Sequence, residues 1–191
     1  MLQRRSENNL DTGEIVQKNI ILIGFMGTGK STIGHALSKS LGYPHLDSDD
    51  LIIARTGKNV SRIFANNGEE FFRDLETETL QSLCEKSHHI ISTGGGIIGR
   101  PENRELLRAL GYVVWLGASP QEILKRTSRN KNRPLLNTDN PLETITNLLD
   151  QRLLHYQNTA HLKIETEGLD SSEITAGIID SARYHFSNNE D

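Results

Sequence analysis

A glycine-rich loop at Gly24–Ser31 constrains this chain more than any other feature, because it fits the pattern G-x-x-x-x-G-K-[ST]. An apolar run, Asn19–Ile23, precedes the loop and is typical of a buried strand. After the loop, Ser31–Leu41 places apolar residues at helical spacing, and Gly42 ends that pattern. A strand, a glycine turn and a helix in this order form the context in which the pattern binds phosphate.

The loop carries the residue types that hold the phosphates of a nucleotide. Its glycines let successive backbone N–H groups converge on phosphate oxygens, and the amino terminus of the following helix adds positive potential. Lys30 supplies a compact charge for the β- and γ-phosphates, and the Ser31 hydroxyl is a ligand for Mg²⁺. The alternative is a glycine turn with an incidental lysine, which the flanking strand and helix disfavour. The loop therefore predicts an ATP or GTP site and leaves the acceptor open.

Beyond the loop, short apolar runs alternate with helical patterns. Strands are expected at Pro44–Asp47, His89–Ser92, Val113–Leu116 and Leu162–Glu165. Helices are expected at Asp50–Arg55, Val60–Asn66, Glu69–Lys86, Pro101–Leu110, Pro120–Arg126 and Leu142–Gln157, with a last helix opened by a capping box at Asp170 and Glu173. This alternation predicts an α/β fold, in which helices cover both faces of a parallel sheet and ligands bind at its carboxyl edge.

Length and composition fit one domain. The chain has 191 residues, of which 35% are hydrophobic and 24% are charged. We expect a single domain over residues 19–191. A mobile tail over residues 1–18 precedes it, with neither the apolar core of a signal peptide nor the composition of a transit peptide.

Charge and cysteine content exclude several classes of protein. The net charge of −4 lacks the basic footprint of a nucleic-acid-binding protein, and the longest apolar stretch is too short to cross a bilayer. The single cysteine, Cys84, forms no internal disulfide and is expected to pack within a helix, which fits a cytoplasmic protein. The seven histidines show no metal-ligand spacing.

Two carboxylates, Asp47 and Asp49, follow the second strand candidate. Strand alternation sends both to the same face, at the sheet edge where ligands collect. One would hold the water shell of Mg²⁺ while the other orients an acceptor hydroxyl. The alternative is that Ser48, Asp49 or Asp50 only caps the next helix.

Two arginines on expected helices are candidates for binding an anionic acceptor. Arg73 would fork onto a substrate carboxylate, although a solvated i,i+4 pair with Glu69 is the alternative. Arg152 lies on an otherwise amphipathic helix and means little alone. Three consecutive glycines, Gly94–Gly96, end another strand candidate and would let a ligand touch the backbone, the alternative being a merely flexible loop.

The segment Thr127–Asn140 is polar, basic and without periodicity. It contains Arg129, Lys131 and Arg133, and it directly follows Arg126. A charge run of this kind is often solvated surface, yet a mobile basic segment is also what a lid over phosphates requires.

Read together, these pieces resemble the shikimate kinase family. The resemblance covers the chain after the tail and rests on G-F-M-G-T-G-K-S-T, L-D-S-D, G-E-E-F-F-R-D-L-E, T-G-G-G and N-R-P-L-L, in this order and spacing. It implies the three-layer P-loop NTPase fold of the nucleoside-monophosphate-kinase-like type, with a five-stranded parallel sheet and a mobile lid at about residues 127–140. It also implies Mg²⁺-dependent transfer of the ATP γ-phosphoryl group to the 3-hydroxyl of shikimate, giving 3-phosphoshikimate and ADP on the way to chorismate and aromatic amino acids.

The resemblance also implies residue roles, matched position by position. The nucleotide would be bound by Gly27, Thr28, Gly29, Lys30, Ser31, Thr32, Arg126 and Arg133, and one Mg²⁺ ion by Ser31 and, through water, by Asp47. Shikimate would be bound by Asp49, Arg73, Gly95 and Arg152, with Glu76 orienting the substrate-side arginine. Lys30, Asp49 and Arg133 would be the catalytic residues. We expect a cytoplasmic monomer with no nucleic-acid or membrane partner.

Two departures from the family pattern stand out. The family commonly has proline two residues after the arginine that Arg152 matches, whereas this chain has Leu154. The segment Thr166–Leu169 contains no arginine, so no adenine contact is assigned to it.

The alternative functions are a related kinase for gluconate or a nucleotide, and a non-catalytic relative that only binds a ligand.

Overall fold

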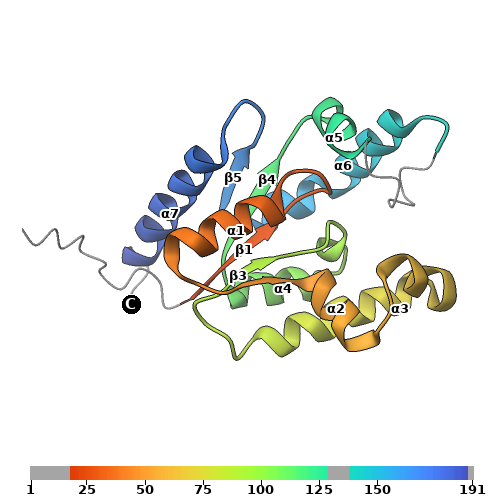
Figure 1. Ribbon diagram of the computed structural model, residues 1–191, viewed down its shortest axis with the longest axis horizontal. Coiled ribbons are helices and arrows are strands. Elements are labelled where there is room, and N and C mark those ends of the chain that lie inside the picture. The colour runs from red at the N-terminus through yellow and green to blue at the C-terminus, as the bar shows by residue number, and fades with distance from the viewer. Residues whose placement is uncertain (1–17, 129–137, 189–191) are drawn as a thin grey trace, which may run out of the picture.

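One five-stranded sheet organises the residues that the structure describes. The computed structural model describes residues 18–128 and 138–188. Within these ranges every strand pairs in parallel, in the order β2-β3-β1-β4-β5 (Figure 1). The strands are β1 (Asn19–Ile23), β2 (His45–Asp47), β3 (Ile90–Ser92), β4 (Gly111–Gly117) and β5 (Leu162–Glu165). The predicted five-stranded parallel sheet is confirmed.

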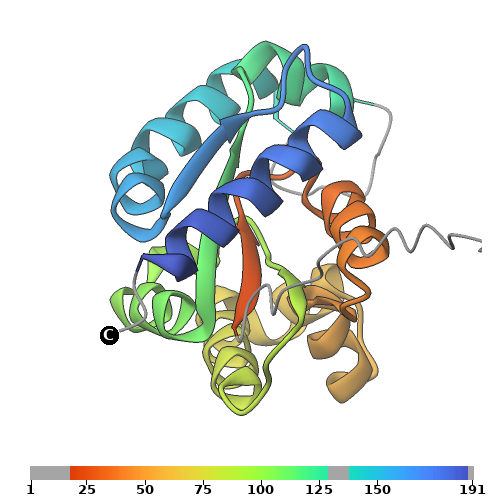
Figure 2. The ribbon, with the colours of Figure 1, turned by 90° about the vertical axis from the view of Figure 1, so that its left-hand side faces the viewer.

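Helices cover both faces of this sheet, so the fold has three layers (Figure 2). The helices are α1 (Lys30–Leu41), α2 (Ser48–Thr56), α3 (Val60–Leu83), α4 (Pro101–Leu110), α5 (Pro120–Thr127), α6 (Pro141–Thr159) and α7 (Ser171–Ser187), with a short 3₁₀ turn, η1 (Ile97–Gly99). In Figure 2, α1 and α7 lie together on one face, where they also contact each other. The opposite face is covered by α4, α6 and the second part of α3.

Alternation along β1 explains how the central strand is buried on both sides. Ile20 and Leu22 pack with α1 and α7, whereas Ile21 and Ile23 pack with α3, α4 and α6. All four side chains are fully buried. A continuous apolar strand of this kind is the pattern expected in a parallel sheet that helices cover on both faces.

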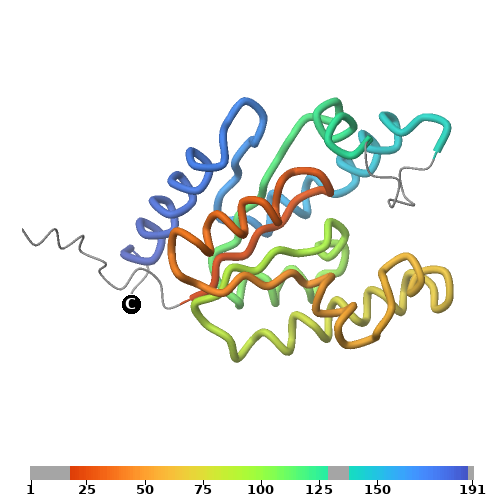
Figure 3. Tube along the Cα trace, viewed as in Figure 1, coloured from red at the N-terminus to blue at the C-terminus, as the bar shows by residue number. Residues whose placement is uncertain are grey.

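Helices α2 and α3 form a projection next to the carboxyl ends of the strands (Figure 3). The two helices predicted on either side of Asn67-Gly68 are continuous in α3 except at Gly68, whose φ of 85° and ψ of 172° break the helical geometry. A small core, Ile52, Ile63, Phe72 and Leu75, joins α2 to α3. In Figure 1 this projection and the α5–α6 pair lie on opposite sides of the strand ends.

Several sequence predictions need correction in detail. The turn η1 was not predicted, because three apolar or glycine residues carry no helical period. The strand predicted at Val113–Leu116 begins two residues earlier, where Gly111 pairs with Asn19. The expected packing role of Cys84 is wrong, since this residue follows α3 and is exposed.

In the ranges that the structure describes, none of the helices has the length and apolar character needed to traverse a membrane.

Candidate active site

The glycine loop joins β1 to α1 at the carboxyl edge of the sheet, as predicted. Gly27 and Gly29 have φ angles of +82° and +94°, which only glycine adopts readily. The Lys30 ammonium folds back over the loop and donates to the carbonyl oxygens of Gly24 and Phe25, each at 2.9 Å. These contacts curl the loop around the lysine and direct the amino terminus of α1 at the space where a phosphate would lie.

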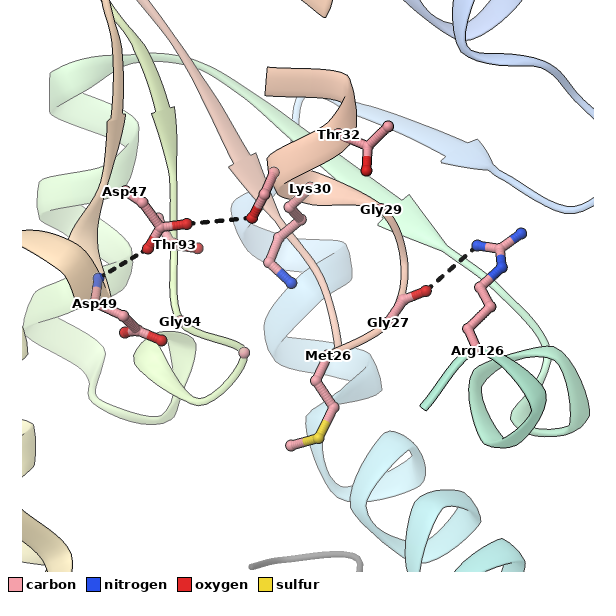
Figure 4. A pocket seen from close by; sticks show the side chains of 12 residues that line it. Met26, Gly27, Gly29, Lys30, Thr32, Asp47, Asp49, Thr93, Gly94 and Arg126 are labelled. Carbon is pink, nitrogen blue, oxygen red and sulfur yellow. Dashed lines mark hydrogen bonds between the residues drawn. The ribbon is translucent and has the colours of Figure 1, made fainter. Parts of the chain in front are cut away.

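Ser31 and Asp47 meet at the mouth of the loop. The Ser31 hydroxyl donates to Asp47 Oδ2 at 3.3 Å, and the other Asp47 oxygen accepts from the backbone N–H of Asp49 at 3.0 Å (Figure 4). Asp47 therefore caps α2, so the alternative considered from the sequence, a cap by Ser48, Asp49 or Asp50, is wrong. The strand alternation assigned to Asp49 is also wrong, because β2 ends at Asp47 and Asp49 lies in the first turn of α2.

Both aspartates nevertheless line one cavity of about 440 Å³. The sequence placed them together for the wrong reason: the turn of a helix, rather than a strand, returns Asp49 to the side of Asp47. In Figure 4 the Lys30 side chain extends into the space between Asp49 and Met26. The cavity is lined by Met26, Gly27, Gly29, Lys30, Ser31, Thr32, Asp47, Asp49, Thr93, Gly94, Gly95 and Arg126.

Two buried carboxylates, Asp49 and Glu76, converge on Gly94. A Cβ atom on Gly94 would lie 2.7 Å from Asp49 Oδ1 and 3.0 Å from Glu76 Oε1. These two oxygens are buried and have no hydrogen-bond partner among the described residues. Both are hydrogen-bond acceptors, but only Asp49 lines the cavity, where a ligand with hydroxyl groups would satisfy it.

Burial shifts the titration of both acids. It raises the pKa of Asp49 to about 6, with a further rise from Asp47 that Lys30 and Arg73 oppose. It raises the pKa of Glu76 to about 7, although the Arg73 guanidinium lowers it. For Glu76 the cost of desolvation exceeds the benefit of its ion pair.

Arg73 lies on α3 beside these carboxylates. Its guanidinium donates to Glu76 at 2.7 Å and to Glu69 at 2.8 Å. The helix pair with Glu69 is therefore present, together with a second and buried pair. Gly96 leaves room for the guanidinium, since a Cβ atom there would lie 2.6 Å from both terminal nitrogens.

Arg152 reaches the same corner from α6. It donates to the Gly95 carbonyl oxygen at 3.0 Å, and its guanidinium lies 5.6 Å from the centre of the Phe25 ring. Leu154, the residue that replaces the family's proline, is 65% exposed and leaves this contact in place. The structure thus brings Arg152 to Gly95, although the helical pattern around this arginine meant little alone.

The sequence analysis missed Tyr156 and considered Ser48 only as a helix cap. The Tyr156 hydroxyl donates to the same Gly95 carbonyl at 2.8 Å, and burial raises the pKa of this tyrosine to about 12. Its spacing of four from Arg152 was the signal that could have found it. Ser48 is fully buried, and its hydroxyl accepts from the Gly94 N–H at 3.0 Å, which ties the glycine turn to α2.

Arg126 lines both the main cavity and a second one of about 240 Å³. Its guanidinium donates to Thr166 Oγ1 at 2.9 Å and to the Gly27 carbonyl oxygen at 3.4 Å. The second cavity is lined by Thr28, Gly29, Thr32, Ile33, Arg126, Thr166, Leu169, Ser171 and Ile174. Thr166 and Leu169, to which the sequence assigns no adenine contact, thus lie beside the phosphate loop.

The predicted lid falls largely outside the described residues. Arg129, Lys131 and Arg133 lie in the range 129–137 and the predicted tail in the range 1–17, neither of which the structure describes. Of the lid's ends, Thr127 is the last residue of α5 and is buried. The role of Arg133 stays a prediction.

Comparisons with known proteins agree on one family. A sequence profile described as "Shikimate kinase" matches residues 26–183. A shikimate kinase of Thioalkalivibrio sulfidiphilus is 44% identical over 173 residues, which cover 91% of this chain and 90% of that protein.

Solved structures separate family from fold. A shikimate kinase from Acinetobacter baumannii, solved in complex with shikimate, has a TM-score of 0.83 and 38% identity over 91% of this chain and 96% of its own. A gluconokinase from Sinorhizobium meliloti has a TM-score of 0.58 and 16% identity over 90% of this chain and 95% of its own, which is a likeness of fold alone.

Proposed function

Since this chain belongs to the shikimate kinase family and is an ATP-dependent phosphotransferase, we propose that it transfers the γ-phosphoryl group of ATP to the 3-hydroxyl of shikimate. The products are ADP and 3-phosphoshikimate, an intermediate on the way to chorismate and the aromatic amino acids. One observation carries the proposal: the phosphate loop and Asp49, which can accept a hydrogen bond from a substrate hydroxyl, line the same cavity. A nucleotide and a small polyol bound there would meet between Lys30 and Asp49.

The nucleotide side of the cavity consists of residues whose chemistry suits phosphate. Gly27–Thr32 present backbone N–H groups, and Lys30 supplies a positive charge beside the loop. The oxygens of Ser31 and Asp47 lie 3.3 Å apart, and oxygen atoms are the ligands that Mg²⁺ prefers, so these residues fit one ion held by Ser31 and, through water, by Asp47. When bound with ATP, Mg²⁺ neutralises charge on the β- and γ-phosphates.

The second cavity suits the adenine ring of ATP. It adjoins the phosphate loop through Thr28, Gly29 and Thr32, and Arg126 borders it. The Arg126 guanidinium is held by Thr166 and Glu122, so its plane is fixed where it would stack on a base. Adenine contacts from Thr166 and Leu169 are therefore added to the nucleotide contact predicted for Arg126.

The acceptor side suits an anionic ring with hydroxyl groups. Arg73 and Arg152 would bind the shikimate carboxylate, since guanidinium groups pair with carboxylates in a fork geometry. Glu76 holds Arg73 in place at 2.7 Å, and the turn at Gly95 is fixed by Arg152 and Tyr156. Asp49 Oδ1 would accept a hydrogen bond from the 3-hydroxyl group of shikimate.

Transfer then needs alignment more than strong base catalysis. The 3-oxygen attacks the γ-phosphorus while the bond from that phosphorus to the β,γ-bridging oxygen breaks, and Asp49 takes the hydroxyl proton. Lys30 offsets negative charge on the γ-phosphoryl oxygens. We place Arg133 there as well, with residues 127–140 closing over the phosphates to exclude water.

Initial rates of ADP release test the proposal against its alternatives. With MgATP, shikimate should stimulate ADP release by at least about 100-fold over water, whereas gluconate and nucleoside monophosphates should not. Stimulation by gluconate would favour the related kinase. Calorimetric binding of shikimate without turnover would favour the non-catalytic relative.

We further propose that residues 19–191 act as one domain in a cytoplasmic monomer. The largest described core clusters join helices from both halves of the chain on the same sheet, which supports a single folding unit. Sedimentation equilibrium tests the monomer, for which the expected mass is 21.4 kDa.

A further inference from the structure

We propose that His45 and Ser92 are positioning residues for the nucleotide site, acting together through the backbone of Lys30. Neither residue lines the cavity described above. They lie on neighbouring strands β2 and β3, beneath the first turn of α1. The inference rests on the assignment of Lys30 and Ser31 to the phosphates and goes beyond it by naming what holds them.

A chain of two hydrogen bonds links these residues to the loop. The Ser92 hydroxyl donates to the Lys30 carbonyl oxygen at 3.2 Å, and the His45 Nε2 atom lies 2.8 Å from the Ser92 oxygen. Ser92 is fully buried. Because a carbonyl only accepts, the single serine proton points to Lys30, and His45 must donate from Nε2. The direction of the whole chain is therefore set, from imidazole to hydroxyl to backbone.

The environment of His45 agrees with a neutral donor. Burial, followed by His35, lowers the pKa of His45, while Asp47 and Asp50 oppose that shift. The His35 ring on α1 meets the His45 ring edge-on, with centroids 4.4 Å apart. A neutral imidazole donates from one nitrogen only, which here is the nitrogen facing Ser92.

Helix α1 has a recess that fits this pair. A Cβ atom on Gly34 would lie 2.8 Å from both Ser92 Oγ and His45 Cδ2, so any side chain there would displace them. Glycine in the middle of a helix is less favourable than alanine. The absence of a side chain is compensated by the close approach of α1 to the polar pair.

The same strand face connects the pair to Asp47. Asp47 is the register partner of Ser92 and follows His45 by two residues, so all three side chains lie on the face under α1. Ser31 bonds Asp47, and Ser92 bonds Lys30, so adjacent residues of the first helical turn are each tied to this face. Loosening Ser92 should therefore disturb the Lys30–Ser31 pair and leave the shikimate side intact.

Two substitutions at His45 separate positioning from simple packing. His45→Gln keeps an N–H donor at a similar distance from the backbone, whereas His45→Leu keeps volume and loses the donor. His45→Leu and Ser92→Ala should each weaken MgADP binding in calorimetry, and raise the KM for ATP, by about three- to tenfold. His45→Gln should stay within about twofold of the wild type. Shikimate affinity should not change in any of them.

Ser38→Ala is the matched control. Ser38 lies on α1, and its hydroxyl also donates to a backbone carbonyl, that of Tyr43 at 2.6 Å. This bond lies at the end of α1 that is far from the phosphate loop. This variant should lower the melting temperature without changing MgADP affinity. The double variant His45→Leu/Ser92→Ala should bind MgADP no more weakly than the single variant with the larger loss of affinity, since both changes interrupt one chain of hydrogen bonds.

Three results would overturn the proposal: unchanged MgADP affinity in both His45→Leu and Ser92→Ala, equal losses for shikimate and MgADP, or multiplicative effects in the double variant. If Ser92→Ala fails to fold, the comparison of His45→Leu with His45→Gln decides alone. Turnover of shikimate by the wild type establishes the proposed function separately, so either proposal can fail without the other.

Discussion

Arg73 donates to Glu76 at 2.7 Å, and the side chain of Glu76 is completely buried while that of Arg73 is 14% exposed. The carboxylate therefore lies beneath the guanidinium and fixes it from below. The part of Arg73 that stays exposed is the part that a ligand could contact. This arrangement, more than the surface pair with Glu69, suits Arg73 to the proposed binding of the shikimate carboxylate, because a buried partner restricts its rotamers.

Replacing Arg73 should remove most of the affinity for shikimate. In Arg73→Ala we expect the Kd for shikimate to rise by roughly 10- to 100-fold, the effect of losing charge-assisted hydrogen bonds, while MgADP affinity stays the same. Arg55→Ala is the control, because Arg55 forms an exposed ion pair with Glu78 at 2.9 Å on the same projection. Calorimetry measures both affinities. Unchanged shikimate affinity in Arg73→Ala would show that the acceptor site is wrongly assigned.

Replacing Glu76 should change the pH dependence of stability. Burial raises the pKa of Glu76 from 4.5 in the unfolded chain to about 7 in the folded one, so the folded protein binds this proton more tightly. The contribution of Glu76 to stability therefore falls as pH rises from about 5 to about 8. The melting temperature of Glu76→Gln relative to wild type should thus be more favourable at about pH 8 than at about pH 5. A difference independent of pH would contradict the buried, proton-binding carboxyl.

The acid limb of the pH–rate profile should report Asp49. Burial and Asp47 raise its pKa to about 6, and the ionised form is the one that accepts the substrate hydroxyl. We expect kcat/KM for shikimate to fall as pH decreases through about 6, as protonation removes this acceptor. Asp49→Asn should lower kcat by roughly 10²- to 10⁴-fold and abolish that limb. A wild-type limb retained in Asp49→Asn would point to another group.

Lys30→Ala should lower kcat by on the order of 10²-fold or more, because the ammonium offsets charge that develops on the γ-phosphoryl group. The same group bonds the carbonyls of Gly24 and Phe25, so some loss of loop order is expected too. Lys39→Ala, in the last turn of α1, removes an equivalent charge far from the loop and should leave kcat unchanged. Stopped-flow or coupled assays measure both variants. A turnover near that of wild type in Lys30→Ala would remove this lysine from the mechanism.

Local spacing in the sequence was sufficient for some parts of the site. The loop pattern placed Lys30 and Ser31 because strand, turn and helix are contiguous there. The spacing of four between Glu69 and Arg73 predicted a helix pair that the structure contains, whereas the pairing of Arg73 with Glu76 was implied only by the family resemblance. Asp49 was placed with Asp47 by a strand rule, whereas the helix cap at Asp47 brings them together.

Contacts between distant segments could not be predicted in the same way. The Gly95 carbonyl accepts from Arg152 and Tyr156, which are 57 and 61 residues away, and no local spacing relates Gly95 to either residue. Ser92 and His45 were likewise read only as parts of strands. Their bond depends on the register between β2 and β3 and on the missing side chain of Gly34, which only the packed structure reveals.

Gly94→Ala gives the most selective test of the acceptor side. The added methyl group would lie 2.7 Å from Asp49 Oδ1 and 3.0 Å from Glu76 Oε1, so both carboxylates must move apart. The backbone at Gly94 is outside the left-handed region, so alanine adds no dihedral strain. We expect the KM for shikimate to rise by about tenfold or more, with MgADP affinity within about twofold of wild type. Gly99→Ala is the control in the same glycine-rich stretch, since a Cβ atom there meets no atom within 4 Å. If Gly94→Ala bound shikimate as tightly as Gly99→Ala does, the convergence of the two acids on Gly94 would have no part in holding the acceptor.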